Sequence, residues 1–183
     1  MPGTVEYSKY FRRMIMKNRK KLLVEIIAGG IIAAIYAVIT ILLAPISYGP
    51  VQVRIAEGLN VLPLYLASGV PGLTVGCLIA NIFGGYGLPD IIFGTLATLL
   101  ASLSVRFIRK TGSRTLRYIL TVLSVTLFNA VIVGAELSML EGIPFFMVAA
   151  EVGLGELVSM LTAGTVIMLV MDRIKGKLND LEE

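Results

Sequence analysis

Uncharged, mainly apolar stretches alternate with short polar segments along this chain, and their lengths match membrane-spanning helices. No charged residue occurs between positions 26 and 53. The run from 22 to about 44 predicts a helix of roughly 23 residues, which is long enough to cross a hydrocarbon core of about 30 Å. The next uncharged run, 58–89, is too long for one span and too short for two full ones. The Gly-Val-Pro-Gly stretch at 69–72 divides it, which predicts two short helices at about 56–68 and 72–83.

Three further helices follow at about 90–107, 118–140 and 146–171, and Asp90 is expected to open the first of them. With the preceding three, they predict an all-α membrane protein built as a six-helix transmembrane bundle. Short hydrophobic segments broken by Pro and Gly are tolerated at membrane depth only where they pack against protein or line a cavity. The pair at 56–83 therefore indicates either a binding chamber or ordinary packing in a small bundle.

The positive charges predict the orientation of this bundle. Fifteen of the 16 Lys and Arg residues lie in three clusters, at 9–21, 106–117 and 173–177, and the exception is Arg54. Cytoplasmic segments of membrane proteins carry an excess of Lys and Arg, so both termini are expected in the cytoplasm of a multi-pass cell-membrane protein. The expected domains are a basic cytoplasmic tail with an amphipathic segment (1–21), a substrate-binding transmembrane domain (22–172) and a second cytoplasmic tail (173–183).

Composition excludes several classes of protein. With 56% hydrophobic residues and a mean hydropathy of +0.87, the chain is too apolar for a soluble domain of this length. The net charge of +4 is better explained by basic segments beside anionic lipid than by nucleic-acid binding. There is no His and a single Cys77, so no zinc or haem ligand set is expected. No Walker loop or nucleophile with a base occurs, and we therefore expect a binding or transport protein without a cofactor rather than an enzyme.

Acidic residues gather on the side of the bundle opposite the basic clusters. An ionisable group inside lipid costs about 2.5–3.5 kcal/mol, so these carboxylates need partners or water, and a water-filled outer pocket is the economical explanation. Arg54 is the only base among them, and it could instead pair with Glu57 three residues on. Asp90 could serve as a helix cap rather than a ligand. The acids concerned are Glu57, Asp90, Glu136, Glu141, Glu151 and Glu156.

Helical spacing selects candidates within this set. Glu57 and Asn60 share one face, as do Asn129 and Glu136. Glu156 lies deeper than Glu151 and about 140° away from it, so only one of the two can point into the pocket. Such a pocket suits a ligand that donates hydrogen bonds or carries positive charge, for example a guanine-like N–H edge. Aromatic side chains that could stack on a flat ring are Tyr48, Tyr65, Phe83, Tyr86 and Phe128.

Two further segments have predicted roles. Helix 22–44 carries a small-residue pattern at Gly30, Ala33, Ala34 and Ala37, which allows another helix to approach closely, either from this chain or from a partner subunit. The Pro- and Gly-containing segment 47–52 is expected to form a lid over the pocket or a rigid plug.

Several stretches together match the pattern of one known family. They are Ala-Pro-Ile-Ser-Tyr-Gly-Pro-Val-Gln-Val-Arg-Ile-Ala-Glu at 44–57, Leu-Pro at 62–63, Pro-Gly-Leu at 71–73, Gly-Cys-Leu-Ile-Ala-Asn at 76–81, Asp-Ile-Ile-Phe-Gly at 90–94, Ala-Thr-Leu at 97–99, Asn-Ala-Val-Ile-Val-Gly-Ala-Glu at 129–136 and Gly-Leu-Gly-Glu at 153–156. On these residues the chain resembles the QueT family of queuosine-precursor transporters. The resemblance covers nearly all of 33–167 and is most specific over 52–90.

The resemblance implies a substrate-binding (S) component of an energy-coupling factor transporter, a six-helix protein that binds substrate near the outer face. Its partners would be a transmembrane coupling subunit and two cytoplasmic ATPases. The implied ligand is a 7-deazaguanine such as 7-aminomethyl-7-deazaguanine, 7-cyano-7-deazaguanine or queuine. The alternatives are an S component for another vitamin or heterocycle and a self-sufficient transporter or channel. The candidate substrate-binding residues are Gln52, Arg54, Glu57, Asn81, Asp90, Asn129, Glu136 and Glu156, with docking assigned to Gly30, Ala33, Ala34 and Ala37.

Overall fold

The computed structural model describes residues 3–49 and 52–180, and all regular secondary structure in that part of the chain is helical. Seven α-helices are joined by a buried 3₁₀ segment and a short π-helical turn. The elements are α1 (Gly3–Leu42), α2 (Ala44–Ser47), η1 (Ile55–Leu64, 3₁₀), α3 (Gly69–Ile82), α4 (Leu88–Ile108), α5 (Arg114–Glu141), α6 (Phe145–Ser159), η2 (Met160–Gly164, π) and α7 (Thr165–Asp180).

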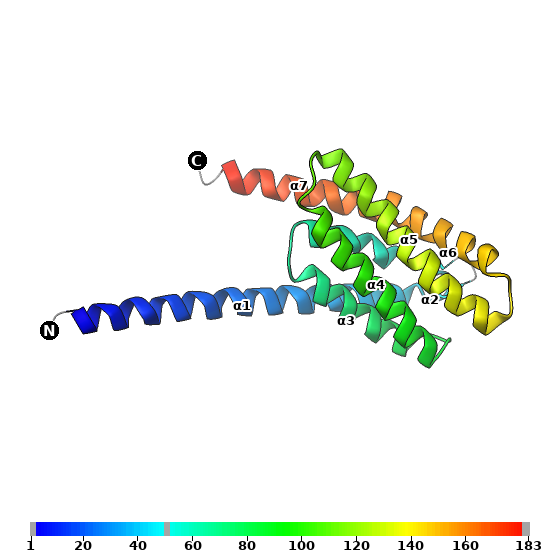
Figure 1. Ribbon diagram of the computed structural model, residues 1–183, viewed down its shortest axis with the longest axis horizontal. Helices are drawn as coiled ribbons and strands as arrows, with labels where there is room; N and C mark the ends of the chain where they lie inside the picture. The colour runs from blue at the N-terminus through cyan, green and yellow to red at the C-terminus, as the bar shows by residue number, and fades with distance from the viewer. Residues whose placement is uncertain (1–2, 50–51, 181–183) are drawn as a thin grey trace.

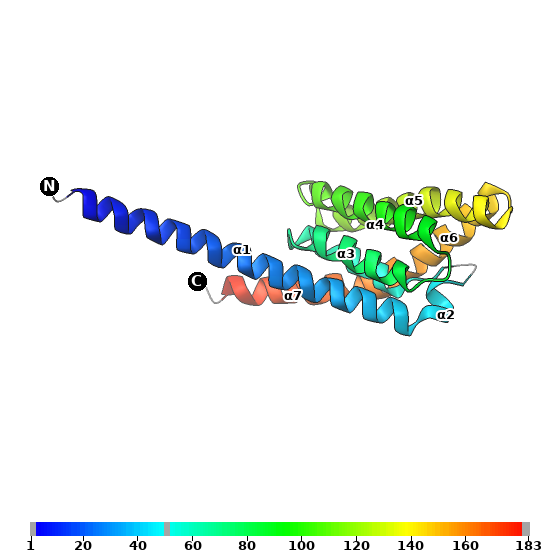
Figure 2. The ribbon, with the colours of Figure 1, turned by 90° about the horizontal axis from the view of Figure 1, so that it is seen from below.

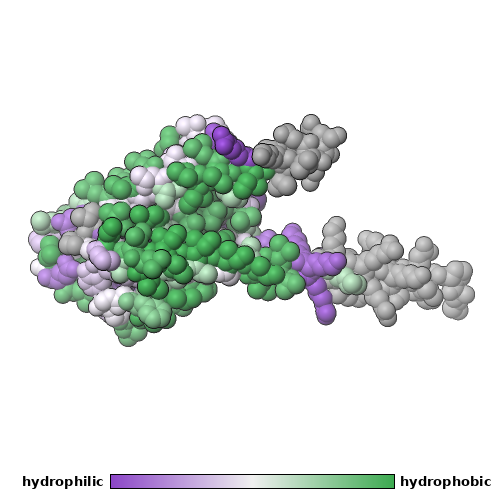
Figure 3. Space-filling model, turned by 180° about the vertical axis from the view of Figure 1, so that it is seen from behind, coloured by the Kyte–Doolittle hydropathy of each residue, from purple (hydrophilic) through white to green (hydrophobic). Residues whose placement is uncertain are grey.

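Four helical segments are long and apolar enough to cross a membrane: 18–42, 88–108, 114–141 and 145–175. The other two apolar segments are short. At about 2.0 Å per residue η1 spans about 20 Å, and at 1.5 Å per residue α3 spans about 21 Å, both less than a hydrocarbon core. The face seen in Figure 3 matches a membrane environment, because a broad hydrophobic band crosses it and hydrophilic residues lie mainly toward its two ends. The chain is therefore an all-helical, multi-pass membrane protein.

Successive helices pack side by side in the order α1, α3, α4, α5, α6. The amino-terminal half of α1 extends well beyond the bundle, on the same side as the chain's C-terminus and the α4–α5 connection (Figure 1). We call this side the basic end, since residues 106–117 and 173–175 lie there. The α3–α4 and α5–α6 connections and α2 lie at the opposite end (Figures 1 and 2).

The 3₁₀ segment η1 runs through the centre of the bundle. Nine of its ten residues are buried, and it contacts α1, α3, α4, α5, α6, η2 and α7. Gly58 permits a close approach of η1 to η2, because a Cβ there would lie 2.6 Å from the Ala163 Cβ and 2.7 Å from the Gly164 backbone nitrogen. Placed in this way, η1 brings its polar side chains into the protein core and away from lipid.

A π-helical turn interrupts the last long helix. In η2 the backbone N–H of Thr165 reaches the carbonyl of Met160, five residues back, where an α-helix would bond four residues back. The Tyr118 hydroxyl from α5 also donates to that carbonyl, at 2.9 Å. The predicted single helix 146–171 thus consists of α6, η2 and α7.

The predicted boundaries were wrong at several places. The first spanning segment, predicted at 22–44, lies at 18–42, and the helix that contains it already begins at Gly3, so residues 3–21 of the predicted tail are continuous with the span. The division within 56–83 lies at 65–68, because Gly69 already begins α3 and Pro71 is accepted in its first turn. The α4 helix begins at Leu88, with Gly87 as its N-cap in a positive-φ conformation, two residues before Asp90.

Candidate functional site

All eight candidate substrate-binding side chains are buried, each at most 5% exposed. They lie between the end opposite the basic end and the middle of the bundle, because they come from the start of α4, the end of α3, the second half of α5, the last turn of α6 and the segment that leads into the start of η1. As predicted, Glu156 is deeper than Glu151, being 1% exposed where Glu151 is half-buried. The residues are Gln52, Arg54, Glu57, Asn81, Asp90, Asn129, Glu136 and Glu156.

Arg54 pairs with Asp90, not with Glu57 as the three-residue spacing had suggested. Its Nη2 lies 3.2 Å from Oδ1 and 3.4 Å from Oδ2 of Asp90. Asp90 is the third residue of α4, whose N-cap is Gly87, and its carboxylate pairs with Arg54. The alternative role of Asp90 as a helix cap is therefore wrong. Asn81 completes the arrangement by donating from its Nδ2 to the Asp90 carbonyl at 2.8 Å. This ion pair joins the entrance of η1 to the end of α3 and the start of α4.

Glu57 is the second centre of the polar cluster. Its carboxylate accepts hydrogen bonds from the Tyr36 hydroxyl of α1, from Asn60 Nδ2, and from the Thr98 hydroxyl of α4 at 3.1 Å. The pairing of Glu57 with Asn60 confirms that they share one face, since side chains three residues apart are superimposed in a 3₁₀ helix. Tyr36 and Thr98 were not predicted as part of the site, although Tyr36 is a hydroxyl-bearing residue within the uncharged apolar stretch 26–53.

Cys77 lies between these two centres and is fully buried with a free thiol. Its sulfur is 3.2 Å from the Thr98 hydroxyl and 3.4 Å from Asn81 Nδ2. Thr98 also bonds to Glu57 and Asn81 to the Asp90 carbonyl, so the thiol contacts both centres of the cluster. No group of three or more potential metal ligands occurs among the residues that the structure describes.

Other polar atoms in the cluster are buried without a hydrogen-bond partner. Both carboxylate oxygens of Glu136 and Oε2 of Glu156 are in this position, together with Gln52 Nε2 and Asn81 Oδ1. Glu136 is close enough to interact electrostatically with Arg54 and Asp90, and Glu156 with Arg54 and Glu57. The cluster therefore places four carboxylates around a single guanidinium. Such an excess of acceptors suits a ligand that brings N–H donors or a positive charge.

The segment that leads into the cluster is strained at Gln52. This residue has a φ of 45°, a left-handed conformation that is uncommon for residues other than Gly, and its side chain is 2% exposed. Strained backbone of this kind is concentrated at ligand clamps and switch regions. Residues 50–51 of the predicted lid 47–52 lie outside the described residues, and Ser47, its first residue, is fully buried.

The aromatic candidates are not gathered at one place. Tyr48 lies beside Arg54, whose Cζ is 5.3 Å from the ring centroid, and its hydroxyl donates to the Ala80 carbonyl at 2.6 Å. In the α3–α4 loop, burial and the nearby Glu141 carboxylate raise the pKa of Tyr86. Phe83 is 69% exposed, and Tyr65 bonds to Asp172 at the basic end. Phe128 packs against the hydrophobic core cluster that contains Val61. Tyr48 is the predicted aromatic residue that contacts Arg54 of the polar cluster directly.

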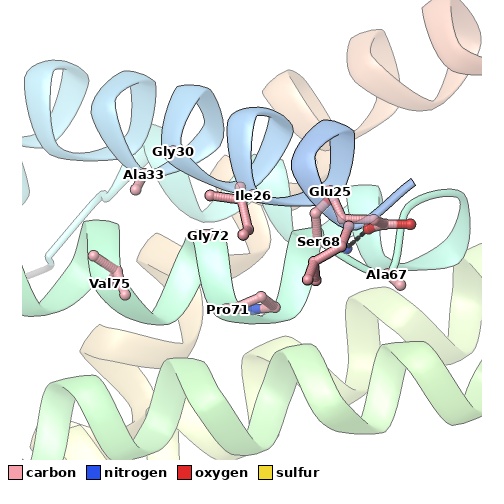
Figure 4. Close-up of a pocket in the computed structure, with 11 residues that line it drawn as sticks. Glu25, Ile26, Gly30, Ala33, Ala67, Ser68, Pro71, Gly72 and Val75 are labelled. Carbon is pink, nitrogen blue, oxygen red and sulfur yellow. Dashed lines mark hydrogen bonds between the residues drawn. The ribbon is translucent and has the colours of Figure 1, made fainter. Parts of the chain in front are cut away.

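The small-residue pattern of α1 has two sides. Ala33 and Ala37 are buried, and α3 approaches so closely that a Cβ on Gly76 would lie 2.8 Å from the Ala33 carbonyl oxygen. Gly30 and Ala34 are exposed. A groove of about 560 Å³ runs between α1 and α3, past Gly30 and Gly72, and at its end the Ser68 backbone N–H donates to Glu25 at 3.0 Å (Figure 4).

Comparison with known proteins identifies the family of this chain. The family model described as "QueT transporter" matches residues 26–173. The "Queuosine precursor transporter QueT" of Lactococcus lactis subsp. cremoris (strain MG1363) is 28% identical over 169 residues, which cover 86% of this chain and 95% of that protein. No solved structure matches the chain significantly. Because the family match covers most of the sequence, from α1 to α7, the chain belongs to the QueT transporter family.

Proposed function

We propose that this protein is the substrate-binding (S) component of an energy-coupling factor transporter and that it captures a 7-deazaguanine queuosine precursor. Membership of the QueT family and the name of the Lactococcus relative support a queuosine precursor as the ligand class. The candidate ligands are 7-aminomethyl-7-deazaguanine, 7-cyano-7-deazaguanine and queuine. Each of them carries a guanine-type edge with adjacent N–H donors.

The observation that carries the proposal is the set of buried oxygens without partners on Glu136 and Glu156. A carboxylate without a partner inside a protein is costly, and a ligand with N–H donors or a cationic amine would supply the missing hydrogen bonds. One carboxylate would bind the guanine-type edge and the other the aminomethyl group. Amide contacts would come from Gln52, Asn81 and Asn129.

The remaining candidate residues would hold the shape of this site. Arg54 and Asp90 bind each other, and Glu57 already accepts three hydrogen bonds from Tyr36, Asn60 and Thr98. They would reach the ligand only by exchanging these partners. All eight side chains are buried, so entry of the ligand requires a local opening, for which the strained segment at Gln52 is the best candidate.

The distribution of charge supports an orientation with the basic end in the cytoplasm. Both termini would then be cytoplasmic, and the buried carboxylates would lie toward the outer face of the cell membrane. The sequence contains no Walker loop, so ATP-driven uptake would require separate subunits: a transmembrane coupling protein and two ATPases. The exposed Gly30 and Ala34 on α1, beside the groove against α3, would form the surface for the coupling protein.

Calorimetry with the purified full-length protein tests the ligand class. The ligands are 7-aminomethyl-7-deazaguanine, 7-cyano-7-deazaguanine and queuine, with guanine and thiamine as competitors. Tight binding of a deazaguanine that thiamine does not displace is the expected result, and binding of none of the three would refute the proposed ligand. Uptake into liposomes by this chain alone would not affect the proposed ligand, but it would refute the S-component role.

A further inference from the structure

A second cavity, of about 660 Å³, lies at the basic end, far from the buried carboxylates. It is bounded by the end of η1, the α4–α5 connection and α7. Its apolar lining residues include Met168, Met171 and Ile174 of α7. Four cationic side chains also line it: Arg109 and Lys110 from the α4–α5 connection, Arg117 of α5 and Lys175 of α7. The cavity thus combines apolar side chains with a cluster of positive charge.

The acid that lines this cavity does not neutralise the cluster. Asp172 receives the Tyr65 hydroxyl on Oδ1 and the Arg114 Nε on Oδ2, each at 2.5 Å, and Arg114 is not among the cavity's lining residues. Arg117 donates weakly to the backbone carbonyls of Thr111 and Gly112, at 3.5 and 3.4 Å. Among the described side chains, Arg109, Lys110 and Lys175 form no ion pair. An anion in the cavity would meet cations not occupied by a described carboxylate.

The position of the cavity indicates where that anion comes from. The spanning segment of α4 ends at Ile108 and that of α5 begins at Arg114, so the cations lie where the hydrocarbon core gives way to the head-group region. Basic pockets between transmembrane helices at this depth bind anionic lipid head groups. A free phosphate ion would leave the apolar lining residues uncovered, whereas the first carbons of an acyl chain would pack against them.

We propose that this cavity binds the head group of an anionic phospholipid. The negatively charged head group, including its phosphate, lies among Arg109, Lys110, Arg117 and Lys175. The glycerol backbone and the start of an acyl chain lie along Met168, Met171 and Ile174. Bound in this way, the lipid joins the α4–α5 connection to α7 and stabilises the basic end.

The test uses the purified full-length protein in a non-ionic detergent. Its thermal unfolding is followed after addition of phosphatidylglycerol, of phosphatidylcholine with the same acyl chains, or of inorganic phosphate. Ligands that bind the folded state raise the melting temperature. We expect an increase of several degrees with phosphatidylglycerol and little change with the other two. An equal increase with phosphate would identify a site for a free anion. An equal increase with phosphatidylcholine would show that binding does not depend on the net charge of the lipid. Either result overturns the proposal.

A matched pair of variants locates the effect. The cavity variant carries Arg109→Gln, Lys110→Gln and Lys175→Gln, and the control carries Arg19→Gln, Lys20→Gln and Lys21→Gln, which remove the same charge from an exposed stretch of α1. The cavity variant should lose most of the stabilisation and retain fewer phosphatidylglycerol molecules in native mass spectrometry, while the control resembles the wild type. Equal losses in both variants would indicate nonspecific attraction. Retention of lipid by the cavity variant, with loss of a co-purifying protein, would assign the cavity to a protein partner.

Discussion

Arg54 and Asp90, 36 positions apart in the sequence, form an ion pair in which both side chains are at most 3% exposed. The pair joins the entrance of η1 to the first turn of α4, where a carboxylate also interacts favourably with the helix dipole. The Tyr48 ring covers the guanidinium, and Asn81 holds the backbone of Asp90. The ion pair therefore fixes the point at which the chain turns into the core.

Breaking this ion pair should destabilise the protein strongly. Arg54→Met leaves Asp90 as a buried charge without its cation, at a cost of about 3–5 kcal/mol. Thermal unfolding in detergent measures the change. The control is Arg114→Gln, because the Arg114–Asp172 pair is 54% and 30% exposed and should contribute only about 0–1 kcal/mol. Similar effects of the two variants would contradict a structural role for Arg54.

Glu156→Gln should weaken deazaguanine binding while the protein remains folded. Losing a hydrogen bond to a charged group costs about 1.5–3 kcal/mol, roughly a 10- to 150-fold increase in Kd. Calorimetry gives the affinity, and the melting temperature gives the stability. Glu151→Gln, on the same helix and half-buried, is the matched control and should bind like the wild type. Unchanged affinity in Glu156→Gln would remove that residue from the proposed site.

Gly58→Ala should destabilise the bundle. The added methyl group would overlap the Ala163 Cβ and the Gly164 backbone, which cannot rotate away, so a cost of about 1–3 kcal/mol is expected. Gly85→Ala serves as the control, since a Cβ there meets nothing within 4 Å. A melting temperature equal to that of the wild type for Gly58→Ala would mean that η1 and η2 are not in close contact.

Gly30→Leu and Ala34→Leu should spare substrate binding and reduce uptake. Both positions are exposed, and a Cβ on Gly30 meets nothing within 4 Å, so the fold should tolerate a larger side chain that blocks a partner helix. The measurements are calorimetry and uptake in cells that contain the coupling subunits. Ala150→Leu, an exposed position on α6, is the control. Normal uptake in all three variants would argue against docking through this surface of α1.

The fold was predictable mainly where one physical constraint dominates. The apolar runs predict helices at about 90–107 and 118–140, which agree with the observed spans 88–108 and 114–141. The three basic clusters are correctly predicted to lie at one end. Helix limits were less predictable, because the more polar amino-terminal half of α1 leads into the apolar half with no Pro or Gly between residues 4 and 28. The 3₁₀ geometry of η1 was not predictable either, since its stability comes from contacts with seven other elements.

The candidate site was likewise predictable only in part. A search for polar residues in apolar segments finds all the buried carboxylates and amides, since burying such groups requires a compensating function or partner. It cannot identify the partners. The sequence neighbour of Arg54 is Glu57, but the ion pair is made with Asp90, and Glu57 is bound by Tyr36 of a different helix. Those choices depend on how α1, η1 and α4 pack, which no local spacing encodes.

The π-helical turn at Met160–Gly164 makes the length of the last helix as important as its composition. A π turn accommodates one residue more than an α turn, and in an α-helix one residue corresponds to a rotation of about 100°. Loss of one residue there would rotate all of α7 by more than a quarter turn. Asp172 would then face away from both Tyr65 and Arg114, which it now contacts. A single extra amino acid therefore sets the phase between the half of the helix that carries Glu156 and the half that meets the basic end.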